Sequence, residues 1–198
     1  LDTVVISKHT KFEESSFPSN TVIVYRDQID PVVPDTALFV CNGVEAEYTG
    51  LYFSYGDSTC SVVDRDTNAV LESNFVIPGV VCYKGNEYKV TSIGYESLGL
   101  MDVKSVVIPN TVRTIGKTAF VACKNLESVV IPNSVEVIGN EAFEMCSSLK
   151  RVEIPSSVVE IGRQAFFECT SLDTVVISKH TKFEESSFPN TTVIIYRD

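Results

Sequence analysis

The chain has 198 residues, enough for one substantial core or two small ones, and its ordinary apolar and charged contents exclude wholesale disorder. Its net charge of −10 argues against a nucleic-acid binder and against electrostatic docking on anionic membranes. No apolar run approaches the roughly 18 residues of a membrane-spanning helix, so we expect no membrane insertion.

The first segment, residues 1–27, is almost repeated at the end of the chain. "LDTVVISKHTKFEESSFPSNTVIVYRD" and residues 172–198 agree at 24 of 27 positions. We therefore expect residues 1–27 to be the last repeat and C-terminal cap of a preceding module, in a window on a longer tandem array. The preceding coil that would cover residues 1–27 is absent from this sequence. We therefore also expect end-to-end self-association through residues 1–27.

Residues 28–37, "QIDPVVPDTA", carry two prolines and no periodicity, which predicts a linker. Residues 38–89 are rich in strand formers, with turn signals at 55–57 and 84–86, and we expect them to form a β-rich N-terminal cap. Ile77-Pro78 and Ile93-Gly94 match the repeat described next, which predicts a hairpin inserted between them.

Residues 90–189 hold a repeat with a period of 23 residues. "VKSVVIPNTVRTIGKTAFVACKN" (103–125), "LESVVIPNSVEVIGNEAFEMCSS" (126–148) and "LKRVEIPSSVVEIGRQAFFECTS" (149–171) align without gaps. A weaker copy precedes them, and a degenerate copy follows in which Phe188 takes the place of the repeated Phe. One such unit cannot bury its own apolar face, so the pattern predicts a stacked solenoid.

Each part of the repeat predicts a local structure. L-x-x-V-x-I has the alternation of a short strand, and the following Pro ends it because Pro cannot donate a ladder hydrogen bond. We expect Gly116, Gly139 and Gly162 to occupy corners that need a positive φ. A-F-x-x-C has helix-like spacing and predicts a helical or 3₁₀ turn that inserts the Phe. Residues 190–198 then predict a C-terminal cap strand.

The string I-P-x-x-V-x-x-I-G-x-x-A-F-x-x-C resembles the BspA-like (Treponema-type) leucine-rich repeat. The resemblance covers residues 90–189 and, as a fragment, residues 1–18. It implies a leucine-rich-repeat solenoid with its strands on a concave side. Together with residues 38–89, the sequence thus predicts a β-rich solenoid capped by antiparallel β structure. The resemblance also implies a non-enzymatic protein at the cell surface or outside the cell, in some members an adhesin for host matrix proteins.

Repeat proteins bind through laterally aligned outward positions, because each repeat adds an equivalent residue to one surface. A protein ligand is therefore expected on the outward residues of the strands, which include an apolar column of valines interrupted by Glu153. A weaker second stripe is Val121, Met145 and Phe167. The candidate partner-binding residues are Lys104, Ser105, Val107, Glu127, Ser128, Val130, Lys150, Arg151, Glu153, Asp173, Thr174 and Val176.

The remaining chemistry-bearing residues favour packing over catalysis. Cys123, Cys146 and Cys169 recur at the repeat period and are interpreted as buried thiols, because no C-x2-4-C zinc pairing exists. In an extracellular protein, one disulfide can form among Cys41, Cys60 and Cys82, and the sequence leaves the pairing open. The two histidines, His9 and His180, are the same position in two copies and form no catalytic set.

The sequence thus predicts a recognition module without enzymatic activity, metal or cofactor. The alternative is a structural spacer in an array of modules. The two interpretations differ in whether the outward strand residues contact a ligand.

Overall fold

The structure is a computed structural model. It describes residues 51–65, 72–83 and 86–197 with their side chains, except for the side chains of Tyr52 and Tyr83. It also describes the backbone of four further strands, at residues 3–6, 22–25, 39–41 and 44–46. The chain divides into two compact units, 1–38 and 39–198. The expected linker, 28–37, lies outside the described residues.

The first unit contains two strands, β1 (Thr3–Ile6) and β2 (Val22–Tyr25). They pair in parallel with Thr3 opposite Val22. The near-identical segment at the end of the chain has the same arrangement, because β16 (Thr174–Ser178) and β17 (Val193–Arg197) pair in parallel with Thr174 opposite Val193. The two copies therefore share one strand register.

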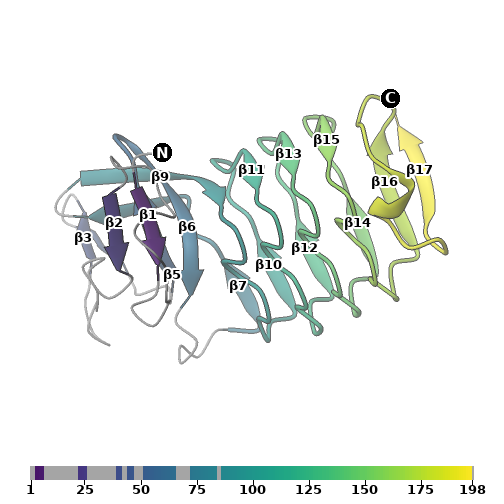
Figure 1. Cartoon of the computed structure of the whole chain (residues 1–198), viewed down its shortest axis with the longest axis horizontal. Helices are drawn as coiled ribbons and strands as arrows, with labels where there is room; N and C mark the ends of the chain where they lie inside the picture. The colour runs from purple at the N-terminus through teal and green to yellow at the C-terminus, as the bar shows by residue number, and fades with distance from the viewer. Residues whose placement is uncertain are drawn as a thin grey trace. The chain divides into compact units, whose positions relative to one another are not determined.

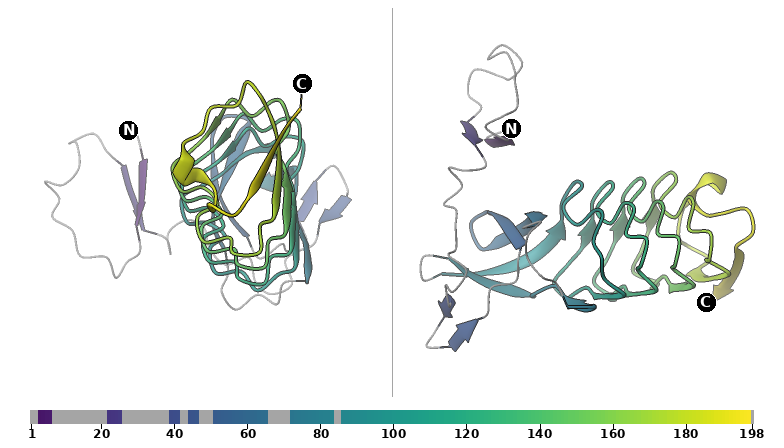
Figure 2. Two further views of the ribbon diagram at one scale, coloured as in Figure 1. Left: turned by 90° about the vertical axis from the view of Figure 1, so that its right-hand side faces the viewer. Right: turned by 90° about the horizontal axis from the view of Figure 1, so that it is seen from below.

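The second unit confirms the predicted solenoid. Strands of successive coils pair in parallel, and partners such as Val106 and Val129 lie one 23-residue period apart. Figure 1 shows the coils side by side along the stack, and in the end-on view of Figure 2 they superimpose in projection. One side of the coils carries β7 (Asn74–Val76), β10 (Ser105–Val107), β12 (Ser128–Val130), β14 (Arg151–Glu153), β16 and β17. The other side carries β9 (Asn86–Ile93), β11 (Thr114–Ile115), β13 (Val137–Ile138) and β15 (Glu160–Ile161).

The strand pattern of the repeat works as expected. Val106 and Ile108 lie in the core, whereas Val107 between them is exposed. Pro109 then turns the chain, and its carbonyl accepts the Val112 N–H at 3.1 Å. Alternation places one apolar column inside the stack and another on its surface.

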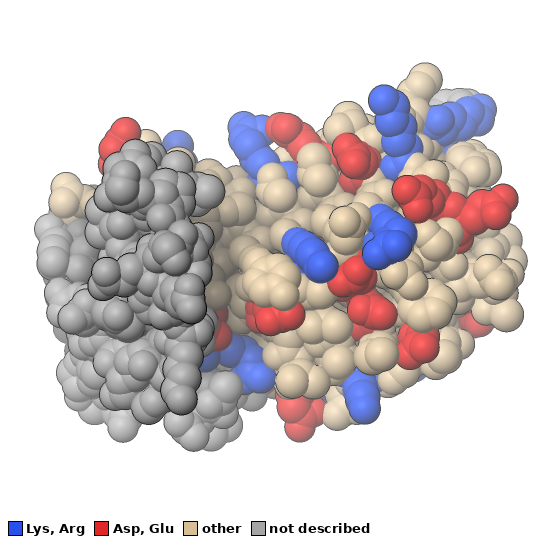
Figure 3. Space-filling model, viewed as in Figure 1, with Lys and Arg blue, Asp and Glu red and all other residues tan. Residues whose placement is uncertain are grey.

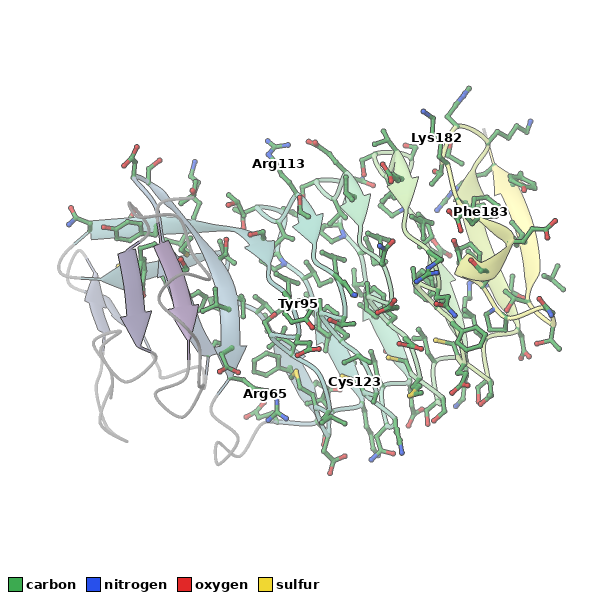
Figure 4. All side chains as sticks on the ribbon, in the orientation of Figure 1. Arg65, Tyr95, Arg113, Cys123, Lys182 and Phe183 are labelled. Carbon is green, nitrogen blue, oxygen red and sulfur yellow. The ribbon has the colours of Figure 1, made fainter. Side chains whose placement is uncertain are left out.

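The repeated phenylalanines form an aromatic ladder through the core, made of Phe120, Phe143, Phe166 and Phe188. Their ring centroids are 5.0, 5.1 and 5.2 Å apart, and successive rings are within 9° of parallel. Phe188 completes the ladder in the degenerate copy, as the sequence predicts. The Phe183 ring packs edge-on against the Phe188 ring, with the two centroids 5.4 Å apart. Figure 4 shows Phe183 at the C-terminal end of the stack.

The expectation of positive φ at the repeated glycines is wrong, since none of Gly116, Gly139 and Gly162 has one. These residues are glycine because neighbouring coils touch there. A Cβ on Gly139 would lie 2.7 Å from backbone atoms of Gly116 and Lys117. The constraint is therefore close backbone approach between coils, rather than a corner within one coil.

The positive φ values occur within the A-F-x-x-C segment and directly before it, at non-glycine residues such as Ala122 (56°) and Thr118 (53°). The segment forms successive β-turns in coils 103–171, and the expected helical turn is absent there. The Phe120 and Ala122 N–H groups donate to Ala142 and Glu144 carbonyls of the next coil, both at 2.7 Å. In a helical turn these N–H groups would donate to carbonyls of the same segment. Because they donate to the next coil instead, the stacking of coils excludes a helical turn here. The degenerate copy does contain a 3₁₀ turn, η2 (Glu185–Ser187), but it ends before Phe188 and so largely precedes the segment in which the turn was expected.

The N-terminal end of the stack is capped by antiparallel strands. β5 (Leu51–Tyr55) and β6 (Thr59–Arg65) form one hairpin, and β8 (Val80–Tyr83) with β9 forms the hairpin expected after Ile77-Pro78. β6 also pairs in parallel with β9 and so joins the stack. The Arg65 guanidinium donates to the Gly99 carbonyl at 3.2 and 3.3 Å, and Figure 4 shows it beside the first coil. A further short antiparallel pair is β3 (Phe39–Cys41) with β4 (Val44–Ala46).

Candidate functional site

The outward side of β7, β10, β12, β14, β16 and β17, here called the strand face, carries the predicted binding residues. In-register parallel pairing sets Ser105 beside Ser128 and Arg151 beside Thr174, so equivalent residues form columns within each sheet. None of the twelve predicted residues is buried. All twelve are therefore accessible, and those that lie within the strands are aligned on the strand face.

The strand face consists of two three-stranded sheets. β7, β10 and β12 form the first, and β14, β16 and β17 form the second. The strand pairing that runs through each sheet does not continue from β12 to β14, whereas on the other side β11, β13 and β15 pair without a break. The strand face therefore has two halves, one for each sheet.

The first half carries a valine column, made of Val76, Val107 and Val130. Their strands pair in register, and the side chains of Val76 and Val130 are 60% and 59% exposed. The valine column is flanked by small polar residues, among which the Ser105 hydroxyl donates to Asn74 Oδ1 at 2.8 Å. Val76 was not among the residues predicted from the sequence. The dipeptide Ile77-Pro78 could have identified it, because Val precedes Ile-Pro in two of the three aligned repeats.

The second half carries a cluster of charged residues beside the apolar Val176 and Ile195. The Arg151 and Arg197 guanidinium groups lie 2.7 and 3.6 Å from opposite oxygens of Glu153. Ion pairs this exposed contribute about 0–1 kcal/mol to stability, so their chief effect is on the surface potential. Arg197 and Ile195 were missed as face residues, because the register of β17 on β16 does not follow from the 23-residue repeat.

The thiol column (Cys123, Cys146 and Cys169) confirms the packing interpretation. All three are free, buried thiols, and each Sγ donates to a carbonyl of the preceding coil at 3.1–3.3 Å. Hydrogen bonds with the neighbouring thiols, together with burial, raise the pKa of Cys146. At Cys146 the neutral thiol is thereby favoured, and a neutral thiol is a poor nucleophile and a poor metal ligand. The hydrogen bond with Cys146 has the opposite effect on its neighbour and lowers the pKa of Cys123. Within the part of the chain that the structure describes, no cluster of ligand side chains suits a metal ion.

The cap cysteines differ from one another. Cys60 is a free thiol, and burial raises its pKa to about 12. Cys82 is disulfide-bonded. The side chain of Cys41 lies outside the described residues, as does His9.

The weaker candidates on the turn side do not form one stripe. Met145 and Phe167 are partly exposed neighbours, with the Met145 N–H donating to the Phe167 carbonyl at 2.8 Å. Val121 is half-buried, and Glu144 separates it from Phe167 at the repeat period. His180 is exposed in a turn, where its backbone N–H donates to Ser178 Oγ at 3.2 Å.

Figure 3 shows acidic and basic side chains interspersed over the coils on the face in view.

Over the described ranges, no helix has the length and apolarity needed to cross a membrane. A comparison with curated proteins finds no significant match.

Solved structures do match. A leucine-rich repeat protein from Bacteroides capillosus is 27% identical with a TM-score of 0.59, over 67% of this chain and 96% of that one. One from Bacteroides ovatus is 33% identical with a TM-score of 0.56, over 74% of this chain and 36% of that one. A leucine-rich cell surface protein from Faecalibacterium prausnitzii shares the fold, with a TM-score of 0.65 at 19% identity, over 100% of this chain and 48% of that one.

The model of the BspA-type leucine-rich repeat region matches residues 88–196, more than half of the chain, in six copies. This match spans the coils whose repeat, glycine contacts and aromatic ladder are described above. The chain therefore belongs to the BspA-type leucine-rich repeat family.

Proposed function

We propose that the chain is a non-enzymatic recognition module that binds a protein through its strand face. The observation that carries the proposal is the valine column, a row of exposed aliphatic side chains held in register by three paired strands. Interface cores are apolar and lie within a polar rim. The small polar column beside the valines and the charged cluster in the second half of the face supply such a rim.

The proposed contact residues lie in the two halves of the strand face. Val107 and Val130 form the apolar centre, and Val176 extends it beyond Glu153. The serines and the threonine are small, so they leave room for the backbone of a partner. The charged residues favour partners whose surface carries complementary charges. The further contact residues are Lys104, Ser105, Glu127, Ser128, Lys150, Arg151, Glu153, Asp173 and Thr174.

We further propose that the module acts outside the cell or on its surface, with a host surface or matrix protein as partner. A disulfide at Cys82 suits an oxidising compartment. A structurally similar protein from Faecalibacterium prausnitzii is described as a cell surface protein. The net charge of −10 makes a nucleic acid an unsuitable partner.

The test is a pull-down from extracts of host surface and matrix proteins with the Val107→Asp, Val130→Asp, Val176→Asp triple variant. Three buried carboxylates would leave unpaired charges in the interface, so capture should be lost. The matched control substitutes Asp for Val80, Leu100 and Val159, which are exposed away from the strand face. Both variants must keep the wild-type circular dichroism spectrum. Unchanged capture by the first variant would remove the strand face as the binding site.

A structural spacer is the second candidate. It is favoured by the near-identity of residues 1–27 and 172–198, which extends to exposed positions such as Asp173 and Lys179. A binding surface is expected to diversify between copies, whereas a spacer has no reason to do so. End-to-end association through residues 1–27 would build such a spacer.

A further inference from the structure

The last strand of the solenoid, β17, presents an open edge. It pairs with β16 on one side, and among the described strands it has no partner on the other. Its apolar side chains are well exposed, with Val193, Ile195 and Tyr196 at 59%, 48% and 51%. Only Arg197 carries a charge among its five residues. An open, apolar edge of this kind is a template for another strand.

The hydrogen-bonding groups at this edge can be identified. The Val193 N–H donates to the Asp173 carbonyl at 2.8 Å, so it points towards β16. Backbone groups alternate along a parallel strand, and Ile195 and Arg197 therefore point the same way. The N–H and C=O groups of Ile194 and Tyr196 face outward.

Strand β1 supplies the complementary edge. Its sequence, Thr3-Val-Val-Ile6, is identical to Thr174–Ile177 of β16, and it pairs with β2 in the register that β16 uses for β17. In β16 the other edge is occupied by β14, and the N–H of Ile154, the residue after β14, donates to the Val176 carbonyl at 2.8 Å. The equivalent edge of β1, at Thr3 and Val5, has no partner among the described strands. Two-stranded sheets are only marginally stable in water, so a third strand would stabilise this one.

We propose that β17 of one chain pairs in parallel with β1 of a second copy, joining chains head to tail. The joint continues the parallel strand pairing seen within each chain, because the resulting order β14-β16-β17, then β1-β2 of the next copy, is parallel throughout. It uses two different edges, so it is heterologous and leaves one edge of each kind open at the ends. Assemblies should therefore grow beyond a dimer. The joint is independent of ligand binding at the strand face.

The experiment uses two complementary full-length variants, in which Pro removes one outward N–H. Ile194→Pro blocks the β17 edge, and Val5→Pro blocks the β1 edge. Light scattering after size exclusion should show the average mass of the wild-type chain rising with concentration past that of a dimer. Each variant alone should be monomeric, and their equimolar mixture should form a 1:1 dimer through the two intact edges. Ile194→Val, which keeps the N–H, should associate like wild type, and so should Val107→Asp.

A dimer formed by Val5→Pro alone would overturn the proposal, because it would show a symmetric β17–β17 contact. So would a wild-type chain that stays monomeric at every concentration, or a mixture that does not associate. Should either Pro variant fail to fold, amide exchange in the wild-type chain decides the matter. Exchange at Ile194 and Tyr196 should slow as the concentration rises, and exchange that does not change with concentration would refute the joint.

Discussion

Replacing Phe143 by Ala removes the central rung of the aromatic ladder. The ring is 0% exposed and stacks on Phe120 at 5.0 Å and on Phe166 at 5.1 Å. Losing the buried ring in favour of a methyl group costs about 2 kcal/mol in transfer free energy. Losing two stacked pairs adds about 0.5–1.5 kcal/mol for each pair. The sum, about 3–5 kcal/mol, agrees with the usual cost of a buried Phe→Ala change.

Urea denaturation followed by circular dichroism measures the free energy of unfolding. The control is Phe167→Ala, since this ring is 37% exposed and outside the aromatic ladder. We expect it to cost about 1 kcal/mol or less. A loss below about 1 kcal/mol for Phe143→Ala, or equal losses for the two variants, would refute the continuous aromatic core.

Two further predictions test the corrected local structures by the same denaturation measurement. Gly139→Ala should cost about 1–3 kcal/mol, because the new Cβ meets backbone atoms of Gly116 and Lys117 at 2.7 Å. Gly56→Ala, whose Cβ would lie 3.4 Å from the nearest atom, should be nearly neutral, and equal costs would argue against close coil contact. Glu168→Gly should leave stability unchanged or raise it by up to about 1 kcal/mol, because Glu168 has a φ of 58° and is exposed. A helical turn would instead lose about 1 kcal/mol on this change, so a loss of that size would contradict the β-turn assignment.

The parts of the fold that the sequence predicts are those set by side-chain periodicity. The alternation of Val106, Val107 and Ile108 determines which valine is exposed, and Ile77-Pro78 locates the inserted hairpin. Phe188 could be placed in the aromatic ladder despite the degenerate copy around it, because a large apolar side chain is needed to close the core. The same reasoning identified twelve candidate residues, all of which are accessible in the structure.

The parts that could not be predicted depend on contacts between backbones of different coils. A repeated glycine is compatible with a positive φ or with close approach, and only the stack shows that Gly139 lies against Gly116. The spacing of A-F-x-x-C is compatible with a helix until the Phe120 amide is seen to bond the next coil. Likewise, no repeat aligns β17 with β16, so Ile195 and Arg197 were not recognised as part of the strand face.

The central claim, that the strand face contacts a protein partner, can be tested directly by site-specific photo-crosslinking. A photoreactive amino acid replaces Val130, on the strand face, or Val159, away from it, and the two positions are similarly exposed at 59% and 57%. Each chain is irradiated in an extract of host surface and matrix proteins. We predict discrete protein adducts from position 130 and none from position 159. Adducts from position 159 alone, or equal yields from the two positions, would contradict recognition through the strand face.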